Sequence, residues 1–438
     1  MRKYLQLKRP IILVGYTYIH MKLHKLFAVL AAFLFAGFFA FAGECNTKML
    51  ETLVNKGMLS ADEALEVKKL SAAIDASVST PYNDNTISIY ARFQMQYAYL
   101  TTNGDSDSYA TSKNTFMMRR VIFGLATDPS KSYGAKLSFD FIFDNKVSIS
   151  YLYKNIDTDY IKGQLRFGYL KPDFGMEEVT SSFNLYAIER SIATNYWCGP
   201  RNARKLGQGS FMTGLFWYGD VRQVKGLHYF CAVTNSENYK LGGETSLLKD
   251  HNSPDVFGGV SYDFAPFENA KITLGTNVMY GNDADKTAID NTAAIFGVNP
   301  YLRFDYKGVR VLTEFLMSHS DCGKRMDSSY GVQTPMGMNF CVEKKFEAGQ
   351  FGKIAPVFRF TYLDTNGRGV SPSDGLRKAG LGTAFDRARG FYFGANWYVS
   401  GDNSLKVSAG YEYSQFMGSN SGQDAYANTF RMQIQTMF

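Results

Sequence analysis

The stretch FYFGANWYVS, residues 391–400, alternates between two kinds of side chain. One set is apolar and consists of Phe391, Phe393, Ala395, Trp397 and Val399. The residues between them include glycine, serine, asparagine and tyrosine. Because successive side chains of a β-strand point to opposite faces, this period of two predicts a strand with one apolar and one polar face.

The same alternation recurs along the chain from Asn85 onward and predicts about sixteen strands. The segment near 331–344 is the weakest of them because Pro335 interrupts it, and the segment near 308–319 alternates imperfectly. We expect the strands at 86–100, 115–127, 132–143, 147–155, 160–169, 209–219, 224–235, 255–264, 269–281, 294–306, 308–319, 331–344, 351–363, 389–400, 403–416 and 425–438.

The connections between these strands alternate in length. Short ones such as 128–131 and 401–402 are followed by longer polar ones such as 101–114, 170–208 and 364–388. The short connection at 144–146 is an exception. Tight turns at one end and long loops at the other are typical of outer-membrane barrels. We therefore predict an all-β fold, a transmembrane antiparallel β-barrel over residues 85–438.

The amino-terminal region predicts export. Residues 1–42 resemble a signal peptide, with a basic segment at 21–25, an apolar run from Leu26 to Phe39 and an Ala40-Phe41-Ala42 cleavage signal. Met21 is a plausible true start. Residues 1–42 carry six basic and no acidic groups, so the net charge of +7 falls to about +1 after cleavage (7 − 6). The basic charge is thus no indication of nucleic-acid binding.

Residues 43–84 differ from the rest of the chain. Ser60 and Glu63 form a capping-box pattern before an apolar run, so we predict two short helices in a periplasmic leader. The leader is interpreted either as an oligomerisation or tethering segment or as a solvated spacer. The last predicted strand ends in Phe438, and a terminal aromatic residue there resembles the assembly signal of outer-membrane barrels.

Motifs of enzymes and cofactor sites are missing from the sequence. It contains no G-x-S-x-G, H-E-x-x-H or G-x-x-x-x-G-K-[ST] pattern and no C-x-x-C pair. We therefore expect no catalytic residues, no metal site, no cofactor and no enzymatic activity.

Transport through a barrel requires positioned charge on the lumen wall. The polar faces of the predicted strands carry more basic than acidic residues, which favours a positive lumen unless acids and bases pair across neighbouring strands and cancel. The pore-lining candidates on strands are Arg92, Arg120, Lys136, Arg166, Arg303, Arg359, Lys406 and Arg431.

One family resemblance covers nearly all of the mature chain. The run from Gly168 to Glu178, with Lys171, Pro172, Phe174 and Gly175, is followed by Glu189-Arg190-Ser191 and resembles the phosphate-selective porin O and P family. Asp173, between Pro172 and Phe174, departs from the family pattern. Further similar segments are 53–64, 115–120, 396–398 and 430–438.

The resemblance implies a homotrimeric, sixteen-stranded porin whose third external loop folds inward and narrows the pore. The segment 170–208 is third in the order of long connections and is the candidate constriction. Its basic residues Lys171, Arg201, Arg204 and Lys205 are candidates for facing the solute. Glu178, Glu189 and Arg190 are candidates for holding the loop against the barrel wall.

The sequence thus predicts an outer-membrane porin for passive diffusion of small hydrophilic solutes, favouring anions such as phosphate. Its partners are outer-membrane lipid and those solutes. The alternative is an outer-membrane structural or adhesion barrel without an open pore.

Overall fold

The computed structural model describes residues 87–105, 110–142, 146–199, 205–235, 254–282, 294–372, 385–418 and 423–437. The chain divides into two units, Met1–Thr86 and Ile87–Phe438, and the described residues all belong to the second. The predicted signal peptide, the periplasmic leader and Phe438 lie outside the described residues.

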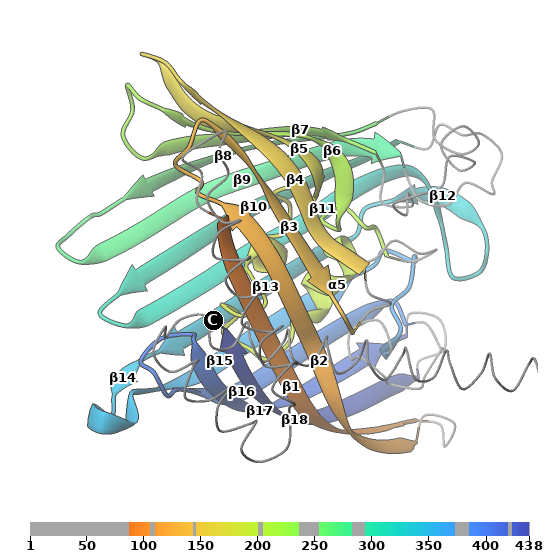
Figure 1. Ribbon diagram of the computed structural model, residues 1–438. Helices are drawn as coiled ribbons and strands as arrows, with labels where there is room; N and C mark the ends of the chain where they lie inside the picture. Colours follow the sequence, from red (N-terminus) through yellow and green to blue (C-terminus); the bar gives the residue numbers. More distant parts are fainter. Residues whose placement is uncertain are drawn as a thin grey trace, which may run out of the picture. The chain divides into compact units, whose positions relative to one another are not determined.

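Antiparallel strands form most of the described part of the second unit (Figure 1). They are β1 (Ile87–Gly104), β2 (Thr111–Thr127), β3 (Tyr133–Asp140), β4 (Lys146–Asp157), β5 (Ile161–Leu170), β6 (Met212–Val221), β7 (Leu227–Thr234), β8 (Asp255–Phe264), β9 (Ala270–Asn282), β10 (Ala294–Tyr306), β11 (Val309–Lys324), β12 (Tyr330–Gln333), β13 (Met336–Lys344), β14 (Phe346–Glu347), β15 (Lys353–Asp364), β16 (Arg387–Tyr398), β17 (Leu405–Met417) and β18 (Asp424–Met437). The helices are α4 (Met176–Val179), α5 (Ile192–Cys198) and the 3-10 turn η2 (Gly349–Phe351).

The strands close into one barrel, because β1 pairs with both β2 and β18. β12 and β13 both pair with β11, whereas β13 and β14 both pair with β15, so these three short strands share one position. The 18 described strands therefore occupy sixteen positions (18 − 2). Closure gives every described strand position a neighbour on both sides, although β2 pairs with β3 only over Ile122–Ala126. Pairing of backbone groups between strands is what a hydrocarbon environment requires. The predicted fold is confirmed, and the interruption at Pro335 falls between β12 and β13.

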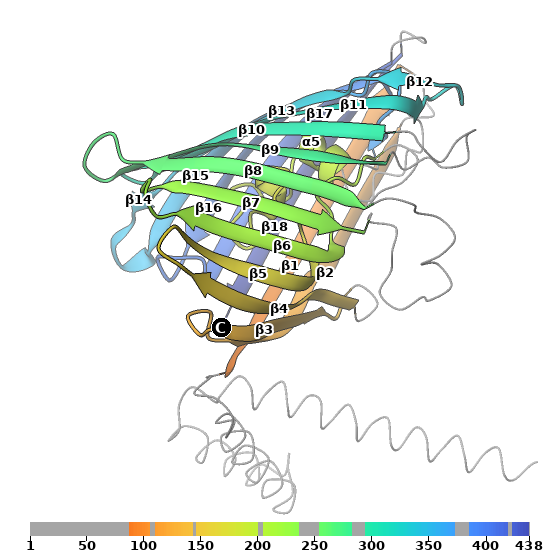
Figure 2. The same ribbon diagram turned by 90° about the horizontal axis from the view of Figure 1, so that it is seen from above.

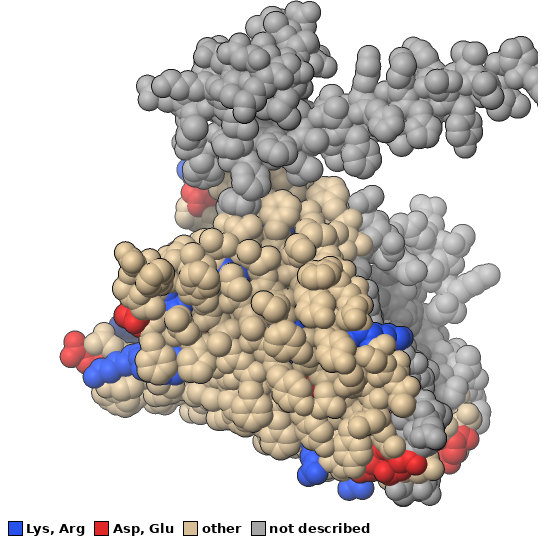
Figure 3. All heavy atoms as spheres, turned by 90° about the horizontal axis from the view of Figure 1, so that it is seen from below, with Lys and Arg blue, Asp and Glu red and all other residues tan. Residues whose placement is uncertain are grey.

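Apolar side chains cover the outside of the barrel, and polar ones point inward. On β18, Phe430, Met432 and Ile434 are exposed, whereas Arg431 and Gln433 are buried. Figure 3 shows the result on one face, where Lys, Arg, Asp and Glu gather mainly near its ends. The intervening band is the surface that lipid would contact.

The turns at one end of the barrel are tight, as Figure 2 shows. The two-residue turn between β10 and β11 has positive φ at Lys307 (46°) and Gly308 (79°), the geometry of a type I′ hairpin. In the β2–β3 turn, Asp128 accepts a hydrogen bond of 2.9 Å from the backbone N–H of Ser130. That bond stabilises the carboxylate and lowers the pKa of Asp128.

A β-bulge interrupts the pairing of β1 with β2. The register shifts between Gln94, which lies opposite Arg120, and Met95, which lies opposite Met118. Arg119 is the extra residue, and it is buried. Bulges re-aim side chains, which explains why two consecutive arginines both bond to groups inside the barrel.

None of the helices in the described part of the chain is long and apolar enough to cross a membrane.

Candidate constriction and pore wall

The described parts of the segment between β5 and β6, residues 171–199 and 205–211, lie inside the barrel, where Figures 1 and 2 show α5 within the ring of strands. Trp197 of α5 is fully buried, and its Nε1 donates a 2.8 Å hydrogen bond to Ser318 Oγ on β11. Gly337 on β13 leaves space for the indole, since a Cβ there would lie 2.7 Å from the Trp197 ring. The segment therefore docks on the inner wall formed by β11 and β13.

A single carboxylate on β11 holds both helices of this segment. Glu314 accepts hydrogen bonds from the backbone N–H groups of Met176 and Glu177, the latter at 3.2 Å. It also accepts from Thr194 Oγ1 at 3.0 Å and from Asn299 Nδ2 at 3.2 Å. Glu314 thereby satisfies first-turn donors of α4 and fixes α5 at the same point.

Arg359 of β15 connects the segment to two further strands. It is 1% exposed and lies 3.3 Å from Glu177 and 2.9 Å from Glu412. It also donates to the backbone carbonyl of Glu189. We predicted Arg359 on the pore surface. The structure instead places it beneath the segment, because the docked loop brings Glu177 against this face.

The bulge residue Arg119 holds the segment at β2. Its Nε lies 2.7 Å from Glu189 Oε1, and Gln96 Nε2 donates to the same oxygen at 3.0 Å. Glu189 thus lies against the wall in the way proposed for a residue that holds the loop.

Glu178 and Arg190 form an ion pair within the segment, with 2.8 Å between Arg190 Nε and Glu178 Oε2. Arg190 also donates to the carbonyls of Glu178 and Thr180, both at 3.0 Å. Lys171 pairs with the other oxygen of Glu178. These contacts fix the conformation of the segment rather than its attachment to a strand.

Side chains of β17, β18 and β1 bind backbone carbonyls of the segment. Lys406 donates to Phe183 at 3.3 Å and to Leu185 at 3.0 Å. Gln435 donates to Phe183 at 2.9 Å, and Gln94 donates to Gln435 at 3.1 Å. Lys406 was predicted to line the pore, but it is buried here because these carbonyls lie over it.

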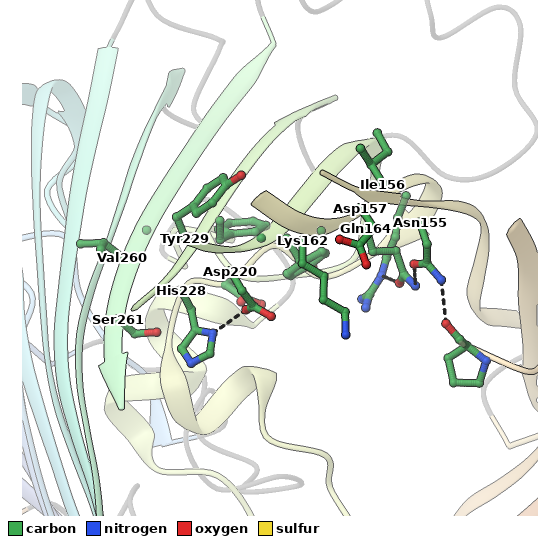
Figure 4. A pocket seen from close by; sticks show the side chains of 18 of the residues that line it. Asn155, Ile156, Asp157, Lys162, Gln164, Asp220, His228, Tyr229, Val260 and Ser261 are labelled. Atoms are coloured by element: carbon green, nitrogen blue, oxygen red, sulfur yellow. Dashed lines mark hydrogen bonds and ion pairs between the residues drawn. The ribbon is translucent and has the colours of Figure 1, made fainter. Parts of the chain in front are cut away.

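The opposite side of the lumen, formed by β4 to β10, faces a cavity of about 820 Å³ (Figure 4). Arg166 lines it and lies between two aromatic rings, 4.2 Å from the Tyr218 centroid and 5.1 Å from that of Tyr151. Asp173 of the segment lies on the same cavity. Water and solutes therefore have room on this side, in contrast to the wall beneath the segment.

Basic side chains lie at the two borders of this side with the segment, on β1 and β3 and on β10, and we include these borders in the open wall. The Arg92 guanidinium of β1 lies 5.5 Å from the Phe183 ring centroid. Arg303 of β10 donates to Thr180 Oγ1 at 2.9 Å. Lys136 of β3 lies between Arg92 and Arg166 in strand order and is close enough to both to interact electrostatically.

At the short-turn end, charges of both signs line the cavity. Asp157 pairs with Arg222, and Asp220 Oδ1 lies 2.6 Å from Nδ1 of His228. Figure 4 shows His228 pointing toward Asp220 and shows Lys162 extending separately. This mouth carries no strong excess of one charge.

The other predicted pore residues have different environments. Arg120 donates to Gln94 Oε1 at 2.6 Å, and Lys205 is partly exposed after α5. Arg431 is buried on β18. Arg201 and Arg204 lie outside the described residues.

Three residues of the wall contacts were not predicted. Arg119 was missed because a bulge reverses the face that alternation assigns to it. Arg310 and Glu343 form a buried pair between β11 and β13, with Arg310 Nε donating to Glu343 at 2.8 Å. Strict alternation from Asn339 through Cys341 would have placed Glu343 on the inner face, but the break at Pro335 weakened that signal.

A closed sixteen-position barrel with an apolar outer surface, a polar inner face and an inward segment is the architecture of outer-membrane porins. Residues 83–216 match the family model described as phosphate-selective porin O and P, which confirms the resemblance found in the sequence. The fold and this match together support an outer-membrane porin. Among curated proteins, none matches the chain.

Solved porin structures resemble the barrel. An anion-selective porin from Comamonas acidovorans gives a TM-score of 0.53 at 11% identity, covering 81% of this chain and 100% of that one. OprB from Pseudomonas putida gives 0.53 at 10% identity, covering 80% and 94%. Salmonella typhi OmpF, in complex with daunomycin, gives 0.51 at 14% identity, covering 80% and 98%. At these identities the similarity concerns the fold alone.

Proposed function

We propose that this porin passes small hydrophilic solutes by passive diffusion and favours anions such as phosphate. The observation that carries the proposal is the charge on the open wall. Arg92, Lys136, Arg166 and Arg303 form no ion pair with a carboxylate of the described residues. Four positive groups beside the narrow part of the lumen raise the local concentration of anions.

The carboxylates inside the barrel are mostly occupied elsewhere. They bind basic side chains or backbone N–H groups at the docked segment, and therefore do not neutralise the open wall; they are Glu177, Glu178, Glu189, Glu314, Glu343 and Glu412. Pairing of opposite charges, the alternative considered from the sequence, thus applies to the wall beneath the segment and to the short-turn mouth. On the open wall, Asp173 interacts electrostatically with Arg166 and Arg303 without forming an ion pair with either of them. The family name and the anion-selective porin of similar fold agree with an anion preference.

Reversal potentials in planar bilayers test the proposal. In a potassium chloride gradient, the wild-type porin should give an anion-shifted potential, and the triple change Arg92→Gln, Lys136→Gln and Arg166→Gln should reduce it strongly. Lys154→Gln is the matched control, because Lys154 is an exposed residue of β4 that bonds to Ser132. A cation-shifted wild type would reject the anion preference.

Arg201, Arg204 and Lys205 remain proposed pore residues. Arg204→Glu and Lys205→Glu should lower anion flux if this part of the segment lines the pore. Unchanged conductance and selectivity would reject that role.

The competing interpretation, a structural or adhesion barrel without an open pore, predicts no conductance from purified protein. Stepwise conductance increases in a bilayer would exclude it. The 820 Å³ cavity on the open side favours the channel.

We also propose a homotrimer in the outer membrane, cleavage after Ala42 and a periplasmic leader at 43–84. Native mass spectrometry in detergent tests the trimer, and amino-terminal sequencing of the mature protein tests the cleavage site. A monomer mass would contradict the trimer, and a mature start other than Gly43 would contradict the cleavage site.

A further inference from the structure

Arg431 of β18 is a buried cation without a partner. Its side chain is 4% exposed, and its Nε and Nη1 have no hydrogen-bond partner among the described residues. No described carboxylate forms an ion pair with it. An uncompensated buried guanidinium is strongly unfavourable, and native proteins almost always satisfy such donors.

The carboxylates nearest to Arg431 in the register are already bound. Arg431 lies opposite Gly410 of β17, so Glu412 is the closest acid on that strand, and it accepts from Arg359 at 2.9 Å. On the neighbouring strand β1, Arg431 lies opposite Ala98. Gln96, two residues before Ala98 on the same face, donates a hydrogen bond from its side-chain amide to Glu189. Glu189 in turn is paired with Arg119.

Further unsatisfied polar atoms belong to residues near Arg431 in the strand register. Thr429, two residues earlier on the same face of β18, has a buried hydroxyl without a partner among the described residues. Gln96 Oε1 is likewise buried and unpaired there. Gly410, opposite Arg431 on β17, makes room for the Tyr392 ring, because a Cβ there would clash with the Tyr392 hydroxyl oxygen. That hydroxyl is also buried without a hydrogen-bond partner among the described residues.

We propose that Arg431 binds a small inorganic anion, of the size of chloride, in the barrel wall. Arg431 supplies two N–H donors and the positive charge, and the Thr429 hydroxyl supplies a third donor. Water bound beside the anion would satisfy Gln96 Oε1. Arg431 does not line the 820 Å³ cavity, so this site is separate from the proposed anion pathway.

Thermal unfolding of the detergent-purified porin tests the site. The melting midpoint is compared in sodium chloride, sodium phosphate and sodium gluconate at equal ionic strength, for the wild type, Arg431→Met and Arg92→Met. We expect chloride to raise the wild-type midpoint by several degrees over gluconate, and phosphate to raise it less. Arg431→Met should lose this difference and Arg92→Met should keep it.

Two results would overturn the proposal: no difference between chloride and gluconate in the wild type, or a difference that Arg431→Met retains. Loss of the difference in Arg92→Met alone would assign anion binding to the open wall instead. If Arg431→Met does not fold, crystals of the wild type grown in sodium bromide decide the matter. An anomalous peak in contact with the Arg431 guanidinium supports the site, and its absence there rejects it. Reversal potentials test the open wall separately, so either proposal can fail alone.

Discussion

The two sides of the barrel interior carry similar residues and use them differently. Beneath the described parts of the segment, on β11 to β18 and at the bulge between β1 and β2, acids and bases meet in buried ion pairs such as Arg359 with Glu412. On the open side, Arg166 lines the cavity, and Lys136 and Arg166 have aromatic and amide neighbours rather than carboxylate partners. The difference comes from the docked segment, which brings Glu177 and Glu189 to one wall only. A basic residue on a barrel strand therefore stabilises the fold or attracts solutes according to what lies above it.

The largest expected effect comes from the paired wall. Arg359→Met should lower the free energy of unfolding by about 3–5 kcal/mol, because Glu177 and Glu412 would be left buried without their cation. Urea unfolding of the porin refolded in micelles measures it. If the free energy of unfolding fell only by the amount typical of an exposed ion pair, the wall beneath the segment would be as hydrated as the open wall.

A smaller effect is expected where the segment touches β13. Gly337→Ala places a Cβ 2.7 Å from the Trp197 ring and 3.1 Å from Ala193, both on α5. We expect a loss of about 1–3 kcal/mol and a changed single-channel conductance, since α5 must move. Gly258→Ala is the control, because its Cβ would make only ordinary contacts at 3.7 Å or more. Equal conductance in both variants would contradict the docking described here.

The next comparison removes one positive charge from each wall. Lys136→Met should shift the reversal potential toward cations, whereas Lys406→Met should shift it less, because segment carbonyls cover Lys406. Bilayer recordings at low salt give the best contrast, since screening is weakest there. Equal shifts would mean that both lysines face the permeating ions.

The smallest effect is expected at the short-turn mouth. Arg222→Met removes an exposed ion pair with Asp157, in which both side chains are about half exposed, and should change the free energy of unfolding by less than about 1 kcal/mol. The same urea titration serves for this variant. A loss comparable to that of Arg359→Met would abolish the distinction between the walls.

Local sequence pattern predicts the barrel well and its interior only in part. Alternation identified the faces of β1, β16 and β18, because the face that each side chain of a strand occupies follows from the faces of its neighbours. It failed at Arg119, where one extra residue in β2 changes which face the next side chain occupies. It assigned Arg359 and Lys406 to the inner face, but it could not identify the groups that bind them. Those partners belong to a segment far away in sequence, and its docking depends on packing such as that of Trp197 against Gly337.

The pairing of β1 with β18 constrains the order in which the barrel assembles. Gln94 bonds to Gln435, and Gln96 to Gln433, across sequence separations of 341 and 337 residues. These contacts do not exist until the final strand has been delivered to the membrane. Because Gln94 and Gln435 also bind the segment, its attachment at this joint must follow closure. A chain that stops before β18 would thus have two open edges and an incompletely anchored constriction, and would leak or aggregate rather than select.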